Sequence, residues 1–174
     1  MIRKWIHKRG LRRLWRRYGA HVRKHAETYN IPAELLLAVA WRESRGKERA
    51  YREEPRLKDA SYGLCQILCS TARDLGFQGE CHKLFDPDLN LRLGAKYLAF
   101  LLGVFRFNQL LAVAAYNAGP ARVYKLWSQS EDVRAFYSRL PRITRDYLRE
   151  VFGPDLDGKG GTLELAREVI NEGV

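Results

Sequence analysis

The sequence contains no apolar run long enough to span a bilayer, no internal repeat and no low-complexity segment. The first residues, MIRKWIHKRG, are basic, but no apolar stretch follows them, so we expect no cleavable export signal. Apolar residues make up 46% of the 174 residues, which is enough to bury a core and excludes intrinsic disorder for the body of the chain. This length predicts one ordinary domain.

Cysteine is scarce, and its three positions are Cys65, Cys69 and Cys81. None forms a CxxC pair and the nearest histidine is His82, so a zinc site would lack a credible fourth ligand and we expect no metal and no cofactor. Cys65 and Cys69 fall one helical turn apart, whereas Cys81 opens a loop that returns toward them. This spacing favours a Cys69–Cys81 disulfide with Cys65 buried and free, although a reducing compartment would leave all three thiols free.

Acidic residues are absent from residues 1–25, which hold ten Lys or Arg. The rest of the chain carries 21 basic and 20 acidic residues, so the formal net charge of +11 comes almost entirely from an N-terminal basic segment. Such a segment suits an anionic partner: nucleic acid, an anionic membrane or a charged cell wall. Two observations argue against nucleic acid: the charge is confined to the N-terminal segment, and the sequence has no recognisable nucleic-acid-binding motif.

Residues 1–17 form a predicted arm, a basic amphipathic helix that Gly10 interrupts. The apolar face of this arm is expected to carry Trp5, Leu11, Leu14 and Trp15, with arginines on the other face. Two interpretations are open. The helix either lies on an anionic membrane or wall surface with its apolar groups inserted, or packs onto the domain as one more core helix with its arginines solvated.

The remaining pattern is helical almost throughout. Pro32 marks a helix start, and the segment AELLLAVAW that follows is apolar on every side, which indicates a buried helix. A polar, charged loop is expected from about Gly46 to Tyr62. The predicted fold class is all-α, or α+β at most, with a body at 18–152 and a polar loop in place of most of a sheet. A glycine-rich joint and a short C-terminal helix are expected over 153–174.

Glu43 is the first candidate for chemistry. It lies at the end of the buried helix, and a carboxylate beside a wall of Leu, Ala, Val and Trp is partly desolvated. Desolvation raises the pKa of the carboxyl, and a neutral carboxylic acid can protonate a glycosidic oxygen near neutral pH. The structural alternative is an ordinary surface glutamate at a helix C-terminus, and the flanking Arg42 and Arg45 would oppose a raised pKa if they lie close.

Four motifs follow one another along the chain: Glu43-Ser44, Gly63-Leu64-Cys65-Gln66, Ala115-Tyr116-Asn117-Ala118-Gly119 and Thr144-Arg145-Asp146-Tyr147. In this order, with a matching helix pattern between them, they resemble the soluble lytic transglycosylase family, a branch of the lysozyme-like superfamily related to goose-type lysozymes. The resemblance covers roughly residues 18–152 and implies a single compact lysozyme-like helical domain. One departure is Cys65, where the family usually has Met; cysteine is also a small apolar packer, so catalysis should survive.

The resemblance implies that Glu43 is the sole acid/base in cleaving the peptidoglycan bond between N-acetylmuramic acid and N-acetylglucosamine, with 1,6-anhydromuramic ends as products. The same resemblance implies a substrate groove formed by Ser44, Gln66, Tyr116, Asn117 and Tyr147. Each of these residues also has a structural interpretation: a loop cap for Ser44, a backbone-satisfied amide for Gln66, helix-end packing for Tyr116 and Asn117, and a core aromatic for Tyr147.

Two alternatives to this activity stay open. The loop after Glu43 carries Glu53, Glu54 and Asp59, and one of them acting as a second carboxylate would make the enzyme a hydrolytic muramidase. The other alternative is a non-enzymatic wall-binding module on the same fold, although such a module has no need of Glu43. We expect a monomer that binds peptidoglycan glycan strands and acts on the cell wall, whether periplasmic, extracellular or phage-delivered.

Overall fold

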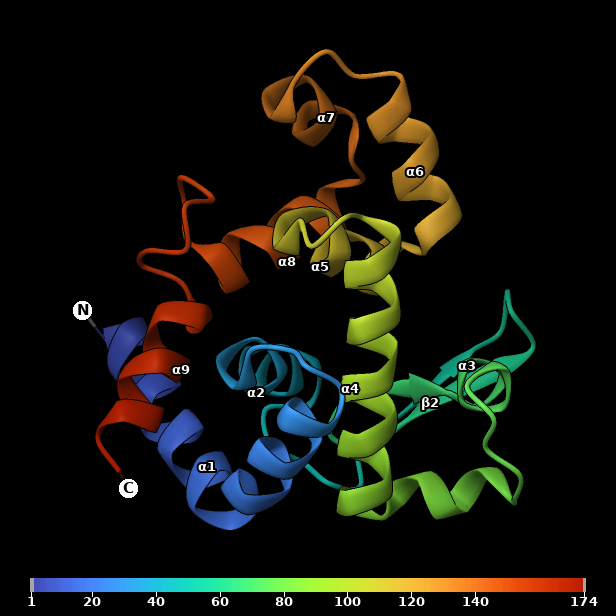
Figure 1. Ribbon diagram of the computed structural model, residues 1–174, viewed down its shortest axis with the longest axis vertical. Helices are drawn as coiled ribbons and strands as arrows, with labels where there is room; N and C mark the ends of the chain where they lie inside the picture. The colour runs from blue at the N-terminus through green and yellow to red at the C-terminus, as the bar shows by residue number, and fades with distance from the viewer. Residues whose placement is uncertain (1, 174) are drawn as a thin grey trace.

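The computed structural model describes residues 2–173, and α-helices make up most of this range (Figure 1). The helices are α1 (Ile2–Thr28), α2 (Ala33–Ser44), α3 (Cys69–Asp74), α4 (Pro87–Val104), α5 (Gln109–Ala118), α6 (Pro120–Ser128), α7 (Val133–Arg139), α8 (Arg142–Phe152) and α9 (Thr162–Asn171), with the 3₁₀ helix η1 (Cys81–Phe85) before α4. Three short strands form one sheet: β1 (Tyr51–Glu54), β2 (Asp59–Tyr62) and β3 (Ile67–Leu68). The predicted fold class, a mostly helical domain with little sheet, is confirmed.

Helix α2 forms the centre of the core. Every residue from Leu35 to Trp41 is buried, as its apolar sequence predicts. Helices α1, α4, α8 and α9 all pack against it (Figure 1). Because α2 is held from several sides, the side chain of Glu43 in its last turn starts from a fixed backbone.

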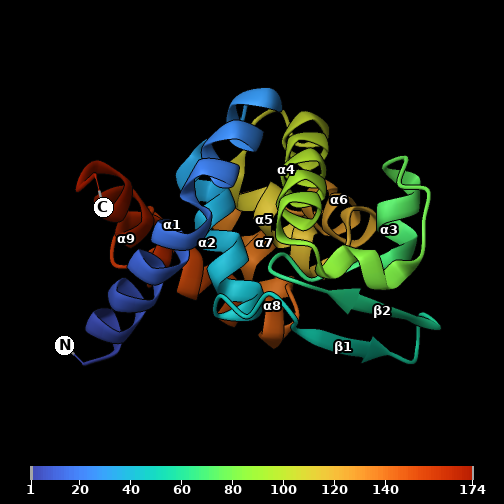
Figure 2. The same ribbon diagram turned by 90° about the horizontal axis from the view of Figure 1, so that it is seen from below.

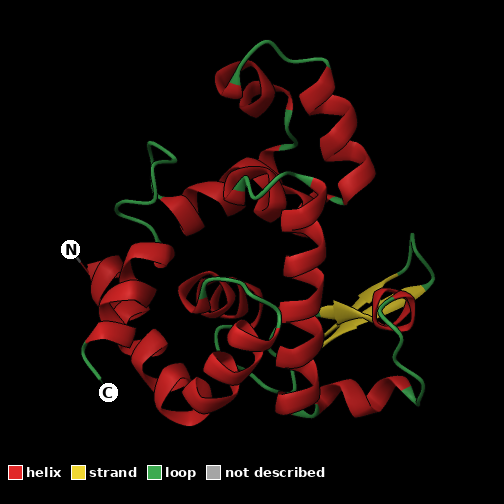
Figure 3. Ribbon diagram, viewed as in Figure 1, coloured by secondary structure: helices red, strands yellow, loops and turns green. Residues whose placement is uncertain are grey.

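The segment expected to be a polar loop contains two of the three strands (Figure 3). β1 pairs antiparallel with β2, with Tyr51 opposite Tyr62, and β2 pairs antiparallel with β3. The hairpin has no clear sequence signal, because three of the four β1 side chains are exposed and the strand therefore lacks an alternation of apolar and polar residues. The hairpin projects from the helical body on the side where α2 ends (Figure 2).

Helix α1 runs unbroken through Gly10, so the predicted interruption is wrong. A Cβ atom at Gly10 would lie only 1.9 Å from the ring of Trp41. Glycine therefore allows the Trp41 indole to approach the α1 backbone closely. Glycine has a poor helix propensity, but the packing of α1 on α2 compensates for it.

The apolar face of α1 packs into the core, which is the second of the two interpretations. Leu11, Leu14 and Trp15 are each at most 3% exposed. Trp5, which was assigned to the same face, is 61% exposed. The expected boundary between the arm and the domain, at residues 17 and 18, falls inside this one helix.

The two ends of the described chain meet where α9 packs on α1 and α2. Three ion pairs, each joining residues 160 apart in sequence, link one flank of α1 to α9: Lys4–Glu164, Lys8–Glu168 and Arg12–Glu172. Successive pairs are four residues apart on both helices, so the helices run parallel. We call this set the ion-pair ladder.

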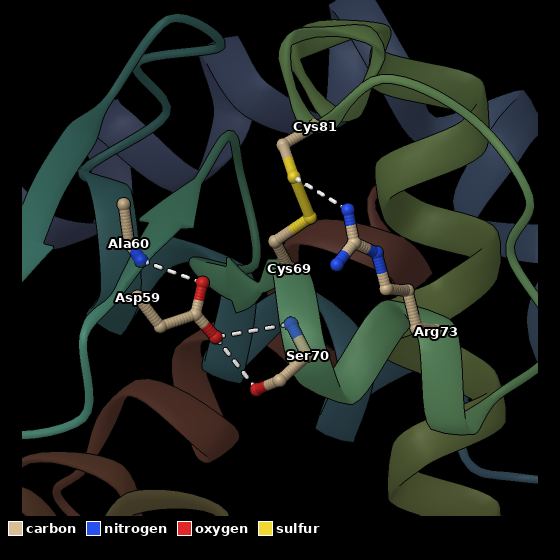
Figure 4. Close-up of a disulfide and its surroundings, with 6 residues drawn as sticks. All are labelled: Asp59, Ala60, Cys69, Ser70, Arg73 and Cys81. Atoms are coloured by element: carbon tan, nitrogen blue, oxygen red, sulfur yellow. Dashed lines mark hydrogen bonds between the residues drawn. A yellow bond between two sulfur atoms is a disulfide. The ribbon is translucent and has the colours of Figure 1, made fainter.

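A disulfide between Cys69 and Cys81 joins the start of α3 to the start of η1 (Figure 4). This is the pair that the spacing favoured, and Cys65 is a buried free thiol. Asp59 on β2 accepts hydrogen bonds from the backbone N–H and the hydroxyl of Ser70, at 3.0 and 2.6 Å (Figure 4). The covalent bond and these hydrogen bonds together fix α3 against the sheet and the chain that leads into α4.

Candidate active site

A cleft of about 330 Å³ opens beside the last turn of α2. Its walls come from α2, the sheet, α3, α4 and the end of α5. The residues that line it are Glu43, Arg52, Glu54, Leu57, Ser61, Gln66, Ile67, Leu68, Thr71, Tyr97, Tyr116, Asn117, Ala118 and Gly119. Four of the predicted site residues therefore meet here: Glu43, Gln66, Tyr116 and Asn117.

Glu43 is held from behind by Tyr147 on α8. The Tyr147 hydroxyl donates a hydrogen bond to Glu43 Oε1 at 2.7 Å, and its ring is 1% exposed. Tyr147 is thus a core aromatic whose hydroxyl reaches the site from beneath the cleft. No donor within residues 2–173 bonds to the second carboxyl oxygen, Oε2 of Glu43, which leaves that oxygen for a ligand.

Burial raises the pKa of the Glu43 carboxyl above its ordinary value of 4.5. The hydrogen bond from Tyr147 and the charges of Arg42, Arg52 and Arg45 act in the opposite direction, but desolvation outweighs them. Burial, followed by the charge of Glu43, also raises the pKa of the Tyr147 hydroxyl well above its usual range, so this group remains a donor. The carboxyl is therefore poised to hold a proton nearer neutral pH than a surface glutamate.

Glu150 on α8 explains why the two flanking arginines do not cancel the effect of burial. Arg42 Nε lies 3.2 Å from Glu150, and Arg45 forms an ion pair with the same carboxylate. The Arg42 Nε–H does not point at the carboxylate, so that contact is an ion pair without a hydrogen bond. The Arg42 guanidinium also stacks on the ring of Tyr147, at 4.7 Å from the ring centroid. Much of the positive charge beside Glu43 is therefore neutralised within the protein.

Tyr116 and Asn117 occupy the last turn of α5. The Tyr116 hydroxyl donates to the backbone carbonyl of Cys65 at 2.8 Å, which ties α5 to the chain leading into β3. Asn117 Oδ1 is buried and has no hydrogen-bond partner within the described residues. A buried acceptor without a donor is costly, so this oxygen is the side-chain group best prepared to accept a hydrogen bond from a ligand in the cleft.

Gln66 lines the cleft, but the protein already uses most of its amide. Nε2 donates to the carbonyls of Ala50 and Gly63, both at 3.0 Å, and Oε1 accepts from Ser61 at 3.1 Å. The backbone of Gln66 has φ +47°, a left-handed conformation that is uncommon outside glycine. Gln66 therefore shapes the cleft wall, and one lone pair of Oε1 is its remaining capacity to bind a ligand.

Ser44 is buried and does not line the cleft. Its hydroxyl donates to the carbonyl of Ala40 and accepts from the backbone N–H of Gly46, both at 3.1 Å. These contacts cap the end of α2 beside Glu43, which is the structural interpretation considered for this residue.

The three other carboxylates differ in their relation to the cleft. Glu54 lines it and pairs with Arg52 at 2.5 Å, whereas Glu53 is exposed outside it. Asp59 is committed to α3: its partial burial would raise its pKa, but the hydrogen bonds from Ser70 and Ala60 lower the pKa below its ordinary value. Glu54 is therefore the candidate for a second carboxylate.

Several lining residues were not predicted from the sequence, among them Arg52, Leu57 and Tyr97. Arg52 belongs to the undetected hairpin, and Leu57 to its turn. Tyr97 lies on α4, with its ring centroid 5.2 Å from that of Tyr116. The one sequence feature that marked Tyr97 was the position of an aromatic residue outside the Leu-rich face of that helix.

Within residues 2–173, no group of three or more His, Cys, Asp or Glu side chains is arranged to hold a metal ion. None of the helices described is long and apolar enough to cross a membrane. The groups that gather in the cleft are a buried carboxyl, two amides, two phenols and one guanidinium–carboxylate pair.

The sequence matches the family model described as Transglycosylase SLT domain over residues 20–137, which is more than half of the chain. The chain belongs to this family. The resemblance drawn from the four motifs is thereby confirmed. The match ends before α8, so Tyr147 lies beyond the matched range of the SLT domain.

The chain is 33% identical to a putative soluble lytic murein transglycosylase of Haemophilus influenzae over 153 residues, which are 82% of this chain and 25% of that protein. It is 29% identical to the soluble lytic murein transglycosylase of Escherichia coli over 149 residues, 79% of this chain and 22% of that one. The peptidoglycan transglycosylase gp16 of Escherichia phage T7 is 29% identical over 159 residues, 90% of this chain and 12% of gp16. The chain thus spans a quarter or less of the length of these relatives.

Solved structures agree with this assignment. The 70 kDa soluble lytic transglycosylase SLT70 of Escherichia coli matches 88% of this chain and 24% of its own with a TM-score of 0.72 at 25% identity. The lytic transglycosylase Slt of Pseudomonas aeruginosa matches 89% of this chain and 24% of its own with a TM-score of 0.69 at 24% identity. Both share the fold of the SLT domain.

Proposed function

We propose that this SLT domain is a peptidoglycan lytic transglycosylase that cleaves the β-1,4 bond between N-acetylmuramic acid and N-acetylglucosamine. The observation that carries the proposal is a buried carboxyl, Glu43, which opens onto a cleft with one oxygen held by Tyr147. Family membership and the relatives named as murein transglycosylases support the same activity.

Glu43 acts first as an acid and then as a base. It donates its proton to the glycosidic oxygen as the bond from C1 of the muramic acid to that oxygen breaks, and the substrate's own N-acetyl group stabilises the positive charge at C1. The ionised Glu43 then takes the proton of the muramic acid C6 hydroxyl, whose oxygen bonds to C1 and closes the 1,6-anhydro ring. Glu43 ends protonated as it began, and no water is consumed.

Neighbouring groups support the two halves of this cycle. Desolvation favours the protonated carboxyl that the first step needs. The Tyr147 hydroxyl donates to the carboxylate formed in between, and hydrogen bonds to a charged acceptor are the stronger kind. Asn117, with its unpartnered Oδ1, is the proposed acceptor for a substrate N–H or O–H.

Hydrolysis is the second candidate, because Glu54 lines the same cleft as Glu43. A second carboxylate could activate water to attack C1, which would leave a reducing muramic acid end in place of the anhydro ring. Arg52 forms an ion pair with Glu54 and so places a positive charge beside that carboxylate.

The test is digestion of purified peptidoglycan in ¹⁸O-labelled water, with the sugar ends identified by mass. We expect unlabelled 1,6-anhydromuramic ends, whereas labelled reducing ends that disappear in Glu54→Gln would establish hydrolysis instead.

Glu43→Gln should lower the cleavage rate by about a thousandfold or more, since it removes the acid and the base together. Glu27→Gln, at an exposed position on α1, is the matched control and should cleave normally. Near-normal cleavage by Glu43→Gln would refute the assignment.

A further inference from the structure

The outward side of α1 carries exposed arginines, of which Arg23 stacks on the ring of Trp15 at 4.6 Å from its centroid. Arg9, Arg13, Arg16 and Arg23 recur at helical spacing, and all four are exposed. No carboxylate within residues 2–173 forms an ion pair with any of them. We call these four residues the arginine face.

The other sides of α1 already account for its packing. Its inner side is buried in the core, and one flank carries the ion-pair ladder to α9. Arg17 pairs with Glu48 at 2.9 Å. Exposed arginines that no carboxylate neutralises repel one another, so packing of the helix alone does not explain why they gather on the remaining side.

The arginine face has the composition of a phosphate-binding surface. A shallow hollow of about 670 Å³ lies beside Arg9, Arg13 and Arg16, with no acidic residue in its lining. Trp5 and three basic residues that pair with carboxylates elsewhere complete the lining: Lys8, Arg12 and Arg17. Arginine presents a planar fork of N–H donors that matches phosphate oxygens in pairs. At the N-terminal end of the helix, Trp5 and Ile6 are 61% and 51% exposed, and the Arg9 guanidinium lies 5.4 Å from the centroid of the Trp5 ring.

We propose that the arginine face docks on an anionic phospholipid bilayer, with α1 lying flat on the surface and Trp5 and Ile6 entering the headgroup region. An exposed row of arginines on a convex helix fits an extended planar array of phosphates, and exposed tryptophan and isoleucine beside it suit the boundary between headgroups and acyl chains. A double helix of nucleic acid offers phosphates too, but gives no role to the exposed apolar pair.

Docking in this way leaves the cleft open. In both views of the ribbon, α1 lies on one side of α4 and the sheet lies on the other (Figures 1 and 2). Since the cleft is bounded by the sheet and the end of α5, a bilayer against the arginine face does not cover Glu43.

The test is co-sedimentation of the full chain with vesicles, at low and at raised salt. Vesicles of phosphatidylglycerol and phosphatidylcholine should bind the protein, vesicles of phosphatidylcholine alone should not, and salt should weaken the binding. The variant Arg9→Gln/Arg13→Gln/Arg16→Gln should bind on the order of a hundredfold more weakly at low salt. The control Arg92→Gln/Arg122→Gln/Arg134→Gln removes the same charge from exposed positions on α4, α6 and α7 and should bind like the parent.

Insertion of Trp5 has its own readout. Brominated phosphatidylglycerol should quench part of the tryptophan fluorescence of the parent, and Trp5→Phe should lose that quenching while still sedimenting with the vesicles.

Three outcomes would overturn the proposal: equal binding by the two triple variants, equal binding to neutral vesicles, or binding to a DNA duplex but not to anionic vesicles. Because the assay involves no peptidoglycan, its failure and the failure of the proposed activity are separate results. Matching melting temperatures of the two triple variants and the parent would exclude misfolding as the cause.

Discussion

Glu43 lies in surroundings that oppose its negative charge, and this makes its contribution to stability depend on pH. Its folded-state pKa is raised above 4.5 by burial. A group of this kind contributes stability that is fully present below pH 4.5 and is lost as the pH rises through the folded pKa. A buried carboxyl of this kind therefore makes the folded protein less stable at neutral pH.

Glu43→Gln should consequently melt at a higher temperature than the parent at about pH 7, and the difference should vanish at about pH 4. Glutamine keeps the size of the side chain and does not titrate, so the ionised carboxylate is the main thing removed. Calorimetry at the two pH values measures this directly. A difference of the same size at both pH values would contradict the raised pKa.

Gly10 is the second residue whose surroundings give a sharp expectation. Gly10→Ala places a methyl group 1.9 Å from the Trp41 ring, and overpacking of this kind costs about 2 kcal/mol. For a chain of this size the melting temperature should fall by about 4–8 °C. The matched control is Gly103→Ala on α4, where nothing lies within 4 Å of the added methyl group. That substitution should stabilise the protein slightly through helix propensity, so the two variants should shift in opposite directions.

At the scale of the element, α3 is the part of the cleft whose position depends on a covalent bond. Removal of the disulfide by Cys69→Ala/Cys81→Ala should lower the free energy of unfolding by about 2–3 kcal/mol. Leu68 and Thr71 line the cleft at this helix, so the variant should also bind glycan strands more weakly.

Reductant separates the bond from the packing of the two side chains. Dithiothreitol should destabilise the parent and leave the double variant unchanged. Thiol counting under denaturing, non-reducing conditions should find one free thiol in the parent, that of Cys65; three would contradict the pairing.

Across the whole molecule, α1 behaves as part of the core and not as a removable arm. Deleting residues 1–17 removes Leu11, Leu14 and Trp15, each buried, and the loss of such side chains costs about 2–5 kcal/mol apiece. Their sum matches the whole stability of an ordinary domain. The truncated chain should therefore show no cooperative melting transition, whereas the triple arginine variant of α1 should melt like the parent. A truncated chain that melts normally would mean that the segment is dispensable.

The candidate site could be predicted best where its residues lie close together in the sequence. The apolar helix ending in Glu43 and the motif at Tyr116 and Asn117 are each contiguous in sequence, so these three lining residues could be named without coordinates. The resemblance, and not the spacing, brought Tyr147 to Glu43, because their contact joins residues 104 apart.

What could not be predicted depends on contacts between distant segments. From the sequence alone Gly10 is predicted to break the helix, and only the structure shows that the Trp41 ring packs against it. β1 is too exposed to show a strand pattern, and Glu150 neutralises Arg42 and Arg45 from another helix altogether. For Gly10 and for the two arginines, the decisive partner lies far along the chain and carries no local signature.

The ion-pair ladder sets an order of events during synthesis. A ribosome releases the chain from its N-terminus, so Lys4, Lys8 and Arg12 emerge long before the carboxylates that meet them, which are 160 residues away. Helix α1 can settle on α2 and α4 earlier, but its charged flank waits until α9 has been made. Closing this contact between segments 160 residues apart therefore cannot precede the synthesis of α9, and it costs more chain entropy than closing a short loop.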